Sequence, residues 1–357
     1  MALNLHKLFV DVFHPEPGER VLVMTDVPHG KLEDHDAWRE RRDMAVEWCE
    51  AWVELGKKIG LEVLPLVTFP AVGVNNGNLP LDKGDPMVLR DALGQTTLAL
   101  ALTQYSPTAP IAAWAKAHPD FRAATLPRVA RRMEKTALSA DYAEVARRCQ
   151  ILKDALDVAE LGRVVFSTGH VWTVDLRFRT VKMDNGQLPR NREGVSVINL
   201  PSGESFQVPY EGERDGEPSR TAGEIPVKYG DELVIFRVEQ NRIVEVVGSG
   251  VKATELRVYF ADDPMRGNVA EFAMGCNPNA VVWGNVLEDE KAGFHWAYGR
   301  SEHLGGVIGP ECFKSEAHIV HQDIVYAKDS PIQVASLMLI SEAGAERELI
   351  RNGEYIF

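Results

Sequence analysis

The chain has 357 residues, of which 45% are hydrophobic and 25% charged, which is the composition of a folded globular protein of about two domains. Intrinsic disorder, collagen and coiled coil are therefore excluded. The formal net charge of −13, from 52 acidic and 39 basic residues, repels phosphate backbones, so we expect no nucleic-acid partner.

Nothing in the sequence indicates secretion or insertion into a membrane. The N-terminal apolar stretch Leu8-Phe9-Val10 is far shorter than the apolar core of a signal peptide. Prolines interrupt the longest runs without charge, Val63–Leu81 and Ala92–Ala115, so neither resembles a membrane span. The four cysteines lie far apart without paired spacing, which is typical of reduced thiols. We therefore expect a cytoplasmic protein.

The first half of the chain alternates strand-like with helix-like patterns. Short apolar runs predict four strands: Arg20–Asp26, Leu61–Thr68, Thr97–Thr103 and Phe121–Leu126. Local composition and apolar spacing predict four helices: Asp36–Ile59, Pro110–Lys116, Pro127–Thr136 and Asp141–Leu161. Because strands and helices alternate, we predict the α/β class, with a doubly wound N-terminal domain.

After Leu161 the apolar residues alternate with a period of two. This pattern predicts five strands: Val164–Ser167, Trp172–Thr180, Val195–Leu200, Glu232–Val238 and Ile243–Val247. Asp184-Asn185-Gly186 and Gln240-Asn241 have the composition of turns. We therefore predict an α/β domain over residues 1–162 and a mainly β domain over residues 163–357.

One short motif resembles a nucleotide-binding fingerprint but stands in the wrong context. Residues 248–253, GSGVKA, fit a loose GxGxxA. The strand predicted before them belongs to an antiparallel hairpin, whereas the fingerprint has force only within a βαβ unit. We interpret this segment as a glycine-rich turn. The sequence also contains no P-loop, nucleophile-elbow or HExxH motif.

Histidine and carboxylate residues recur in the last third of the chain. His321 and Asp323 lie two apart in a predicted strand, Ile319–Tyr326, so their side chains share one face. Imidazole and carboxylate are both good ligands for Zn, Mn, Co or Fe. Glu271 and His295 stand in apolar surroundings, where a charged group needs a compensating partner. That partner is either a metal ion or, for Glu271, a nearby arginine such as Arg266 or Arg300. For His295 the alternative is a hydrogen-bonded histidine of the core.

Several strings, in one order along the chain, resemble the metallo-aminopeptidase family that contains the aminopeptidase T and S group. The strings are NLPSGESFQVP (Asn199–Pro209), NVAEFAMGCNP (Asn268–Pro278), GNVLEDEK (Gly284–Lys291), GFHWAYG (Gly293–Gly299), Leu304-Gly305-Gly306 and His321–Asp323. The resemblance extends over roughly residues 195–330. The N-terminal half agrees with the family only in its α/β character.

This resemblance implies a catalytic C-terminal domain with two divalent ions, Zn, Co or Mn. By position, the metal ligands would be Glu204, Glu271, His295, His321 and Asp323. One acidic ligand would bridge the two ions, and the sequence does not say which. The implied activity is release of N-terminal residues by attack of a metal-bound hydroxide on the peptide carbonyl. The family also implies a homodimer.

The sequence departs from the family near the metal-binding histidine. Some members carry a tyrosine seven residues after it, where this chain has Glu302 followed by His303. We expect His303 to stabilise the tetrahedral intermediate and Glu302 to carry a proton. Tyr298 would point away, since it is an odd number of residues from His295. We interpret the acidic run Glu288-Asp289-Glu290 as a solvated turn or a support for the ligands, with one member open as a general base.

Two alternatives stay open at the level of sequence. The chain is also similar to the Fe(II)-dependent 2,5-dihydroxypyridine dioxygenases, for which His295, His321 and Asp323 would form a mononuclear triad. Two positions disfavour this alternative. Those enzymes carry a metal-binding histidine where this chain has Glu271, and an apolar residue where it has Glu204. The other alternative is a metal-binding module without turnover. For the hydrolase, the substrate is a peptide or a small amide.

Overall fold

The structure is a computed structural model that describes residues 3–192, 194 and 196–357. By its internal contacts the chain divides into two units. The first comprises Met1–Ala146, Asp184–Gly203 and Asn277–Val281, and the second comprises Arg147–Met183, Glu204–Cys276 and Val282–Phe357. The domain boundary at residue 162 stays a prediction. Within the described part of the chain, no helix is long and apolar enough to cross a membrane.

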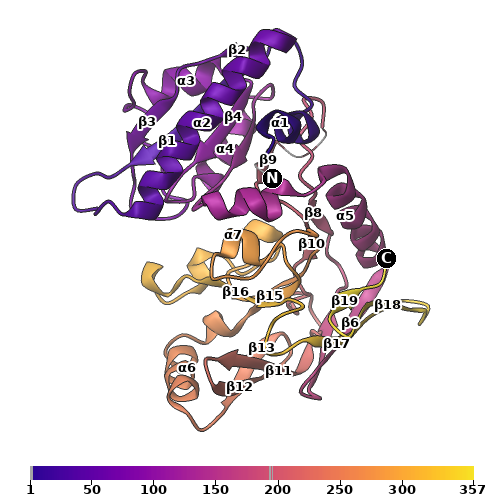
Figure 1. Cartoon of the computed structure of the whole chain (residues 1–357). Helices are drawn as coiled ribbons and strands as arrows, with labels where there is room; N and C mark the ends of the chain where they lie inside the picture. The colour runs from indigo at the N-terminus through magenta and orange to yellow at the C-terminus, as the bar shows by residue number, and fades with distance from the viewer. Residues whose placement is uncertain (1–2, 193, 195) are drawn as a thin grey trace. The chain divides into compact units, whose positions relative to one another are not determined.

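A parallel sheet forms the centre of the first unit (Figure 1). Its strands pair in the order β2-β1-β4-β5-β9, and β3 also pairs with β1. The strands are β1 (Arg20–Val27), β2 (Glu62–Val63), β3 (Val67–Pro70), β4 (Leu98–Leu102), β5 (Arg122–Thr125) and β9 (Val197–Asn199). Because the chain builds outward in both directions from the β1–β4 pair, the predicted doubly wound α/β unit is confirmed.

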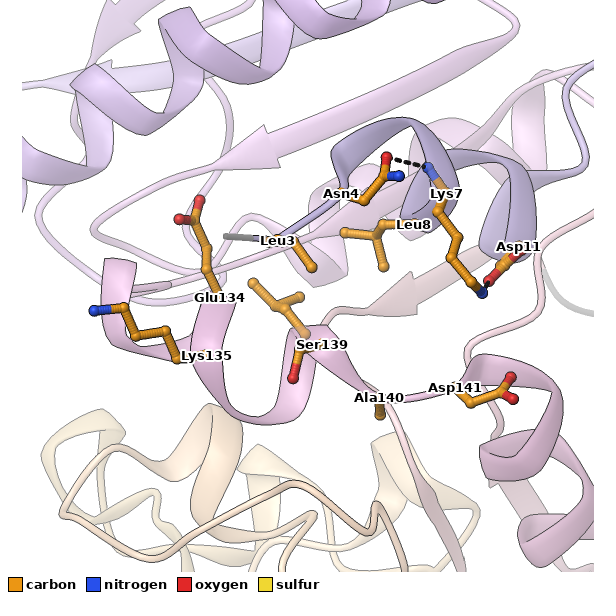
Figure 2. A pocket seen from close by; sticks show the side chains of 11 residues that line it. Leu3, Asn4, Lys7, Leu8, Asp11, Glu134, Lys135, Ser139, Ala140 and Asp141 are labelled. Carbon is orange, nitrogen blue, oxygen red and sulfur yellow. Dashed lines mark hydrogen bonds and ion pairs between the residues drawn. The ribbon is translucent and has the colours of Figure 1, made fainter. Parts of the chain in front are cut away.

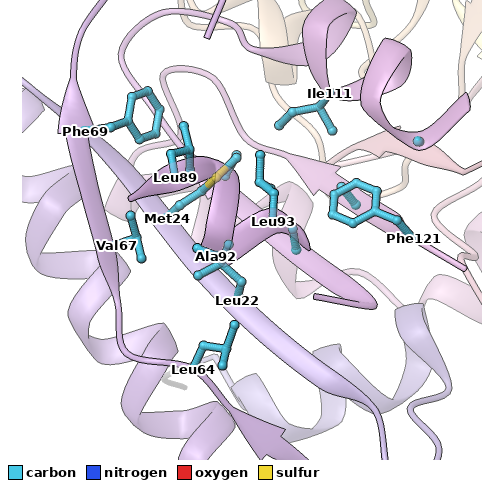
Figure 3. Packing of buried hydrophobic residues seen from close by; sticks show 14 residues of the cluster. Leu22, Met24, Leu64, Val67, Phe69, Leu89, Ala92, Leu93, Ile111 and Phe121 are labelled. Atoms are coloured by element: carbon cyan, nitrogen blue, oxygen red, sulfur yellow. The ribbon is translucent and has the colours of Figure 1, made fainter. Parts of the chain in front are cut away.

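Helices enclose this sheet and complete its apolar core. They are α1 (Leu5–Phe13), α2 (Asp36–Ile59), α3 (Leu89–Gln95) and α4 (Thr108–Ala117). Alternate residues of β1, Leu22 and Met24, pack in a buried cluster with Leu89 and Leu93 of α3 (Figure 3). In a separate contact, Phe9 of α1 stacks on Trp52 of α2 with ring centroids 4.2 Å apart.

Two predicted elements of the first half are wrong in detail. The strand predicted at Leu61–Thr68 is divided into β2 and β3, because Pro65 has no amide to donate to a ladder. The helix predicted at Pro127–Thr136 is only a short 3₁₀ turn, Arg131–Lys135. Its start is prevented by the left-handed backbone of Arg128, with φ at 59°, which no α-helix accommodates.

The helix predicted at Asp141–Leu161 also ends early. Helix α5 spans Tyr142–Asp157, and the next strand, β6, already begins at Ala159 (Ala159–Phe166). Leu161 therefore lies in a strand, although its spacing matches the helical period. In contrast, the predicted helix Asp36–Ile59 matches α2. A glycine with a left-handed backbone, Gly60, ends α2, as is typical of helix C-termini.

The second unit is built from two largely antiparallel sheets (Figure 1). One has the order β16-β15-β14-β10-β8, with β8 (Lys182–Asp184), β10 (Glu204–Gln207), β14 (Val269–Gly275), β15 (Phe294–Gly299) and β16 (His321–Tyr326). The other has the order β13-β12-β11-β7-β6-β17-β18-β19, with β7 (Val171–Asp175), β11 (Ala222–Tyr229), β12 (Glu232–Glu239), β13 (Arg242–Val247), β17 (Val334–Ser341), β18 (Glu346–Arg351) and β19 (Glu354–Tyr355).

Aromatic side chains fill the space between these two sheets. Trp172 of β7 lies with its ring centroid 6.0 Å from Phe272 of β14 and 5.8 Å from Trp296 of β15. All three side chains are fully buried. Aromatic packing of this kind provides large apolar burial with specific ring geometry, so it fixes one face of the five-stranded sheet firmly.

Most strands predicted for the second half are present, but one belongs elsewhere. Of the predicted strand Val195–Leu200, Val195 lies outside the described residues, and residues 197–199 form β9 in the parallel sheet of the first unit. The strand predicted at Trp172–Thr180 ends at Asp175. The hairpin of β12 and β13 turns at Gln240 and Asn241, which both have positive φ, as expected for a tight hairpin turn.

A buried ion pair offers a direct test of the first unit. Glu19 and Arg122 are 0% and 4% exposed, and the guanidinium also donates to backbone oxygens of Phe13 and Leu188. Glu19→Gln leaves the buried charge of Arg122 without its partner. We therefore expect it to lower the free energy of unfolding, measured by urea denaturation, by about 3–5 kcal/mol. Glu62→Gln, which breaks an exposed pair with Arg20, is the control and should cost below about 1 kcal/mol. Equal losses would contradict this account.

Candidate metal centre

Strand register brings the five predicted ligands to one face of the five-stranded sheet. Ala297 of β15 pairs with both Glu271 of β14 and Asp323 of β16. Residues that face each other across an antiparallel ladder project to the same side, so the two carboxylates flank Ala297. In the neighbouring rows, His295 pairs with Ala273, His321 with Gly299, and Glu204 of β10 with Gly275.

Small residues on the same face leave room for these ligands. Each ligand pairs across the ladder with at least one alanine or glycine, and His295 also pairs with Val325 of β16. The alternate positions of β14 and β15, among them Phe272 and Trp296, point to the opposite face and form the aromatic layer. The sheet is therefore polar on one side, where the ligands gather, and apolar on the other.

The five side chains form two groups of three that share one member. Ligand atoms of Glu204, Glu271 and His295 all lie within 4.8 Å of one another, as do those of Glu271, His321 and Asp323. The Nε2 atom of His321 is 3.1 Å from Oε2 of Glu271 and 3.5 Å from Oδ1 of Asp323. Nε2 of His295 is 3.4 Å from Oε2 of Glu204. The structure thus brings all five predicted ligands together, with Glu271 common to both groups.

Both histidines are held so that one ring nitrogen faces the carboxylates. Nδ1 of His295 lies 3.2 Å from the backbone oxygen of Gly293, and Nδ1 of His321 lies 2.8 Å from that of Arg300. A backbone carbonyl that binds one nitrogen fixes the ring orientation and leaves the other nitrogen as the ligand, as is common in metal sites.

The two glutamates of the centre are buried, and their ion-pair partners are other side chains of the centre. Glu204 is 8% exposed and Glu271 6%, and a buried carboxylate is costly unless a cation or hydrogen-bond donors surround it. Neither of the arginines considered for Glu271 pairs with it: Arg300 binds Glu302, and Arg266 pairs with Asp262. Among the described residues, Oε2 of Glu204 is buried without a hydrogen bond.

The carboxylates strongly favour positive charge at the centre. Burial lowers the pKa of His295, but Glu204, Glu271 and Asp323 outweigh it and raise that pKa to about 9. The pKa of His321 is likewise raised well above its ordinary value, since Asp323 and Glu271 outweigh burial. The carboxylates that stabilise a proton on each imidazole would stabilise a metal cation at the same place.

Lys291 is a member of the centre that sequence reasoning missed. Its Nζ lies 2.6 Å from Oε1 of Glu204 and 2.6 Å from Oε1 of Glu290, and its side chain is 1% exposed. In the sequence, a lysine beside acidic residues is more typical of a solvated ion pair. Burial of the pair depends on strand register, which no local pattern reveals.

A close approach between the backbone at Gly275 and the backbone at Glu290 positions Lys291 next to Glu204. The segment before β15 crosses directly over Gly275, the residue that pairs with Glu204. A Cβ atom on Gly275 would lie 2.0 Å from the backbone oxygen of Glu290, which is impossible without displacement. The glycine in NVAEFAMGCNP is therefore required by this crossing.

The acidic run before Lys291 is structural in two of its three members. Glu288 is fully buried and accepts a 2.7 Å hydrogen bond from the indole of Trp283. Asp289 accepts bonds from the backbone amides of Trp283 and Gly284. The expectation of a solvated turn is thus wrong for Glu288. Glu290 binds Lys291, and it is the member that supports the ligands.

Glu302 and His303 lie beside the centre, and neither belongs to the two ligand groups. The ring of His303 meets that of His321 nearly at right angles, with centroids 4.9 Å apart. Glu302 forms an ion pair with Arg300. Their catalytic roles stay predictions. Tyr298 points into the aromatic layer, 5.3 Å from Phe260, as alternation along the strand predicts.

Two other features carry no comparable chemistry. The loose GxGxxA segment leads into helix α6 (Val251–Asp262), and the carboxylate of Glu232 binds the amides of Lys252 and Ala253 there. The start of α6 is thus occupied by the carboxylate of Glu232.

A hollow of about 930 Å³ beside α1 is lined by residues that include Leu8, Lys7 and Asp11 (Figure 2). The charges of Lys7 and Asp11 pair with each other.

The solved structures that resemble the whole chain include the following two. One is a 2,5-dihydroxypyridine dioxygenase from Pseudomonas putida KT2440, with a TM-score of 0.65, 16% identity, and coverage of 99% of this chain and 96% of that chain. The other is wild-type AmpT from Thermus thermophilus, an aminopeptidase T, with a TM-score of 0.57, 17% identity and 99% coverage of both chains. No protein-family model and no curated protein matches the sequence. The resemblance to both groups is therefore confirmed for the fold.

The crossing over Gly275 gives a prediction for stability. Gly275→Ala forces the backbone at Glu290 away, so we expect a loss of about 1–3 kcal/mol in the free energy of unfolding. Gly94→Ala is the matched control, because no atom lies within 4 Å of the added Cβ and Gly94 sits in helix α3. That change should stabilise the protein by about 0.5–1 kcal/mol. A neutral Gly275→Ala variant would refute the close approach.

Proposed function

We propose that this protein is a metal-dependent hydrolase that releases N-terminal residues from peptides or cleaves small amides. The observation that carries the proposal is the position of Glu271, which belongs to both ligand groups. A carboxylate shared by two adjacent three-residue groups is the arrangement expected for a pair of divalent ions bridged by one acidic ligand. Glu271 is thus our candidate for the bridge that the sequence left unassigned.

The donor set fits two divalent cations of the Zn, Co or Mn type. Each group offers two carboxylates and one imidazole, and these oxygen and nitrogen ligands suit such ions. The buried Oε2 of Glu204, which has no hydrogen bond among the described residues, is a donor atom ready for a cation. When bound, paired divalent ions polarise a carbonyl and make hydroxide available near neutral pH.

The side chains of the centre then have distinct tasks. Glu204 and His295 would hold one ion, His321 and Asp323 the other, and Glu271 both. His295 is 1% exposed, whereas the side chains of His321 and Asp323 are 21% and 13% exposed. A substrate would therefore approach from the β16 side. His303, which touches His321 and is partly exposed, stands where it can bind a substrate oxygen.

The mononuclear Fe(II) alternative is less well supported by the site. It requires His295, His321 and Asp323 to converge, and among the described residues these three do not form a ligand group. The group that contains His321 and Asp323 is completed by Glu271. The general likeness to the dioxygenase structure does not offset this difference, because folds host many chemistries. A non-catalytic module is also disfavoured, since all five ligand positions carry competent donors.

A cytoplasmic homodimer acting on a peptide or small amide, without nucleic-acid or membrane partners, completes the proposal. The substrate class rests on the chemistry of the centre. The dimer and the compartment rest on the resemblance of the sequence and its cysteine pattern.

Metal content of single variants tests the bridging role. After reconstitution with Zn²⁺ or Mn²⁺, we expect about two ions per wild-type chain by elemental analysis. Glu204→Gln should leave about one ion, because it affects one ligand group. Glu271→Gln should lose most of both ions, because that side chain serves both groups.

The control for this series is Glu342→Gln, an exposed glutamate of the second unit, which should keep the wild-type metal content. Circular dichroism establishes that each variant is folded. If Glu271→Gln loses no more metal than Glu204→Gln, then Glu271 is not the bridge.

Turnover distinguishes hydrolysis from ring cleavage. We expect the metal-loaded protein to cleave aminoacyl-p-nitroanilides and to leave 2,5-dihydroxypyridine unchanged in the presence of oxygen and Fe(II). Glu271→Ala and His321→Ala should each lower hydrolysis by about a hundredfold or more while the fold persists. Oxygen consumption with dihydroxypyridine, together with no amide cleavage in the presence of Zn²⁺, Co²⁺ or Mn²⁺, would favour the dioxygenase over the hydrolase.

A further inference from the structure

Lys291 places a fixed positive charge inside one half of the centre. Its ammonium group binds Oε1 of Glu204 and Oε1 of Glu290, each at 2.6 Å, and it is 1% exposed. Water therefore screens this charge poorly. Glu204 has only its other oxygen, Oε2, directed towards His295.

In the described part of the chain, no such cation contacts the carboxylates of the other half. Among the described residues, Glu271 and Asp323 form ion pairs only with His321, which is itself a member of the ligand group. Lys291 instead contacts the first half through Glu204, with its ammonium group held between Glu204 and Glu290. The two ligand groups have the same donor types, so the contact of Lys291 with Glu204 is the main difference between their ion pairs.

We propose that Lys291 makes the metal centre asymmetric. The group Glu271, His321 and Asp323 binds its ion tightly and first, and the group Glu204, Glu271 and His295 binds a second ion more weakly. The lysine acts on the second site in two ways: it repels the incoming dication, and it holds Glu204 by one oxygen so that the carboxylate binds metal through the other. This inference rests on the proposed two-metal function.

A titration with Co²⁺, followed by calorimetry and by the visible spectrum of the bound ion, tests the proposal. We expect the wild-type protein to bind Co²⁺ in two steps whose dissociation constants differ by about tenfold or more. Glu204→Gln should remove the weak step, and Asp323→Asn should remove the tight step. Methionine has a side chain of similar length to lysine and no charge. In Lys291→Met, the dissociation constant of the weak step should fall by about tenfold or more, while that of the tight step stays unchanged.

Lys328→Met, which removes an exposed lysine paired with Glu354, is the matched control and should keep the wild-type titration. If Lys291→Met does not fold, the variant Glu290→Gln with Lys291→Met removes both members of the buried pair and should still tighten the weak step, because Glu204 regains its second oxygen. A weak step that is unchanged or further weakened in the folded variant would overturn the role of Lys291. Binding of a single Co²⁺ ion by the wild type would instead overturn the two-metal centre itself.

Discussion

Mutual repulsion of three carboxylates on one sheet face is the constraint on which the centre depends. Glu204, Glu271 and Asp323 converge with two imidazoles in a largely buried space, where like charges cannot all stay ionised without positive partners. The protein supplies an internal cation, Lys291, and the carboxylates raise the pKa of both histidines. The remaining negative potential makes the centre a candidate site for divalent metal, and the proposed function follows from it.

The fold meets this constraint through the simple alternation of a β-sheet. One face of the five-stranded sheet is committed to the aromatic layer around Trp172 and Trp296, which holds the strands rigidly. The other face is free for polar ligands, and alanine or glycine at most of the paired positions leaves the space that they need. Preorganisation by a rigid scaffold is what a metal site requires. Gly275 shows how strict the fit is, because a single methyl group there would expel the segment that carries Lys291.

Sequence reasoning succeeded where chemistry is local and failed where it depends on register. The spacing of His321 and Asp323 and the period of α2 are readable within a short window, so both could be predicted. The burial of Lys291 and Glu288, and the passage of residues 197–199 into the parallel sheet of the first unit, depend on pairings between distant segments. The left-handed backbone at Arg128 likewise has no signature in composition. Likeness of fold to both a dioxygenase and AmpT leaves the chemistry to be argued from the side chains.

The central claim is that Glu271 lies between two metal ions, and anomalous diffraction tests it most directly. Crystals of the protein soaked in Mn²⁺ should show two anomalous peaks about 3.5–4 Å apart, one beside Glu204 and His295 and one beside His321 and Asp323, with the carboxylate of Glu271 between them. A single peak bound by His295, His321 and Asp323, without Glu271, would contradict the account.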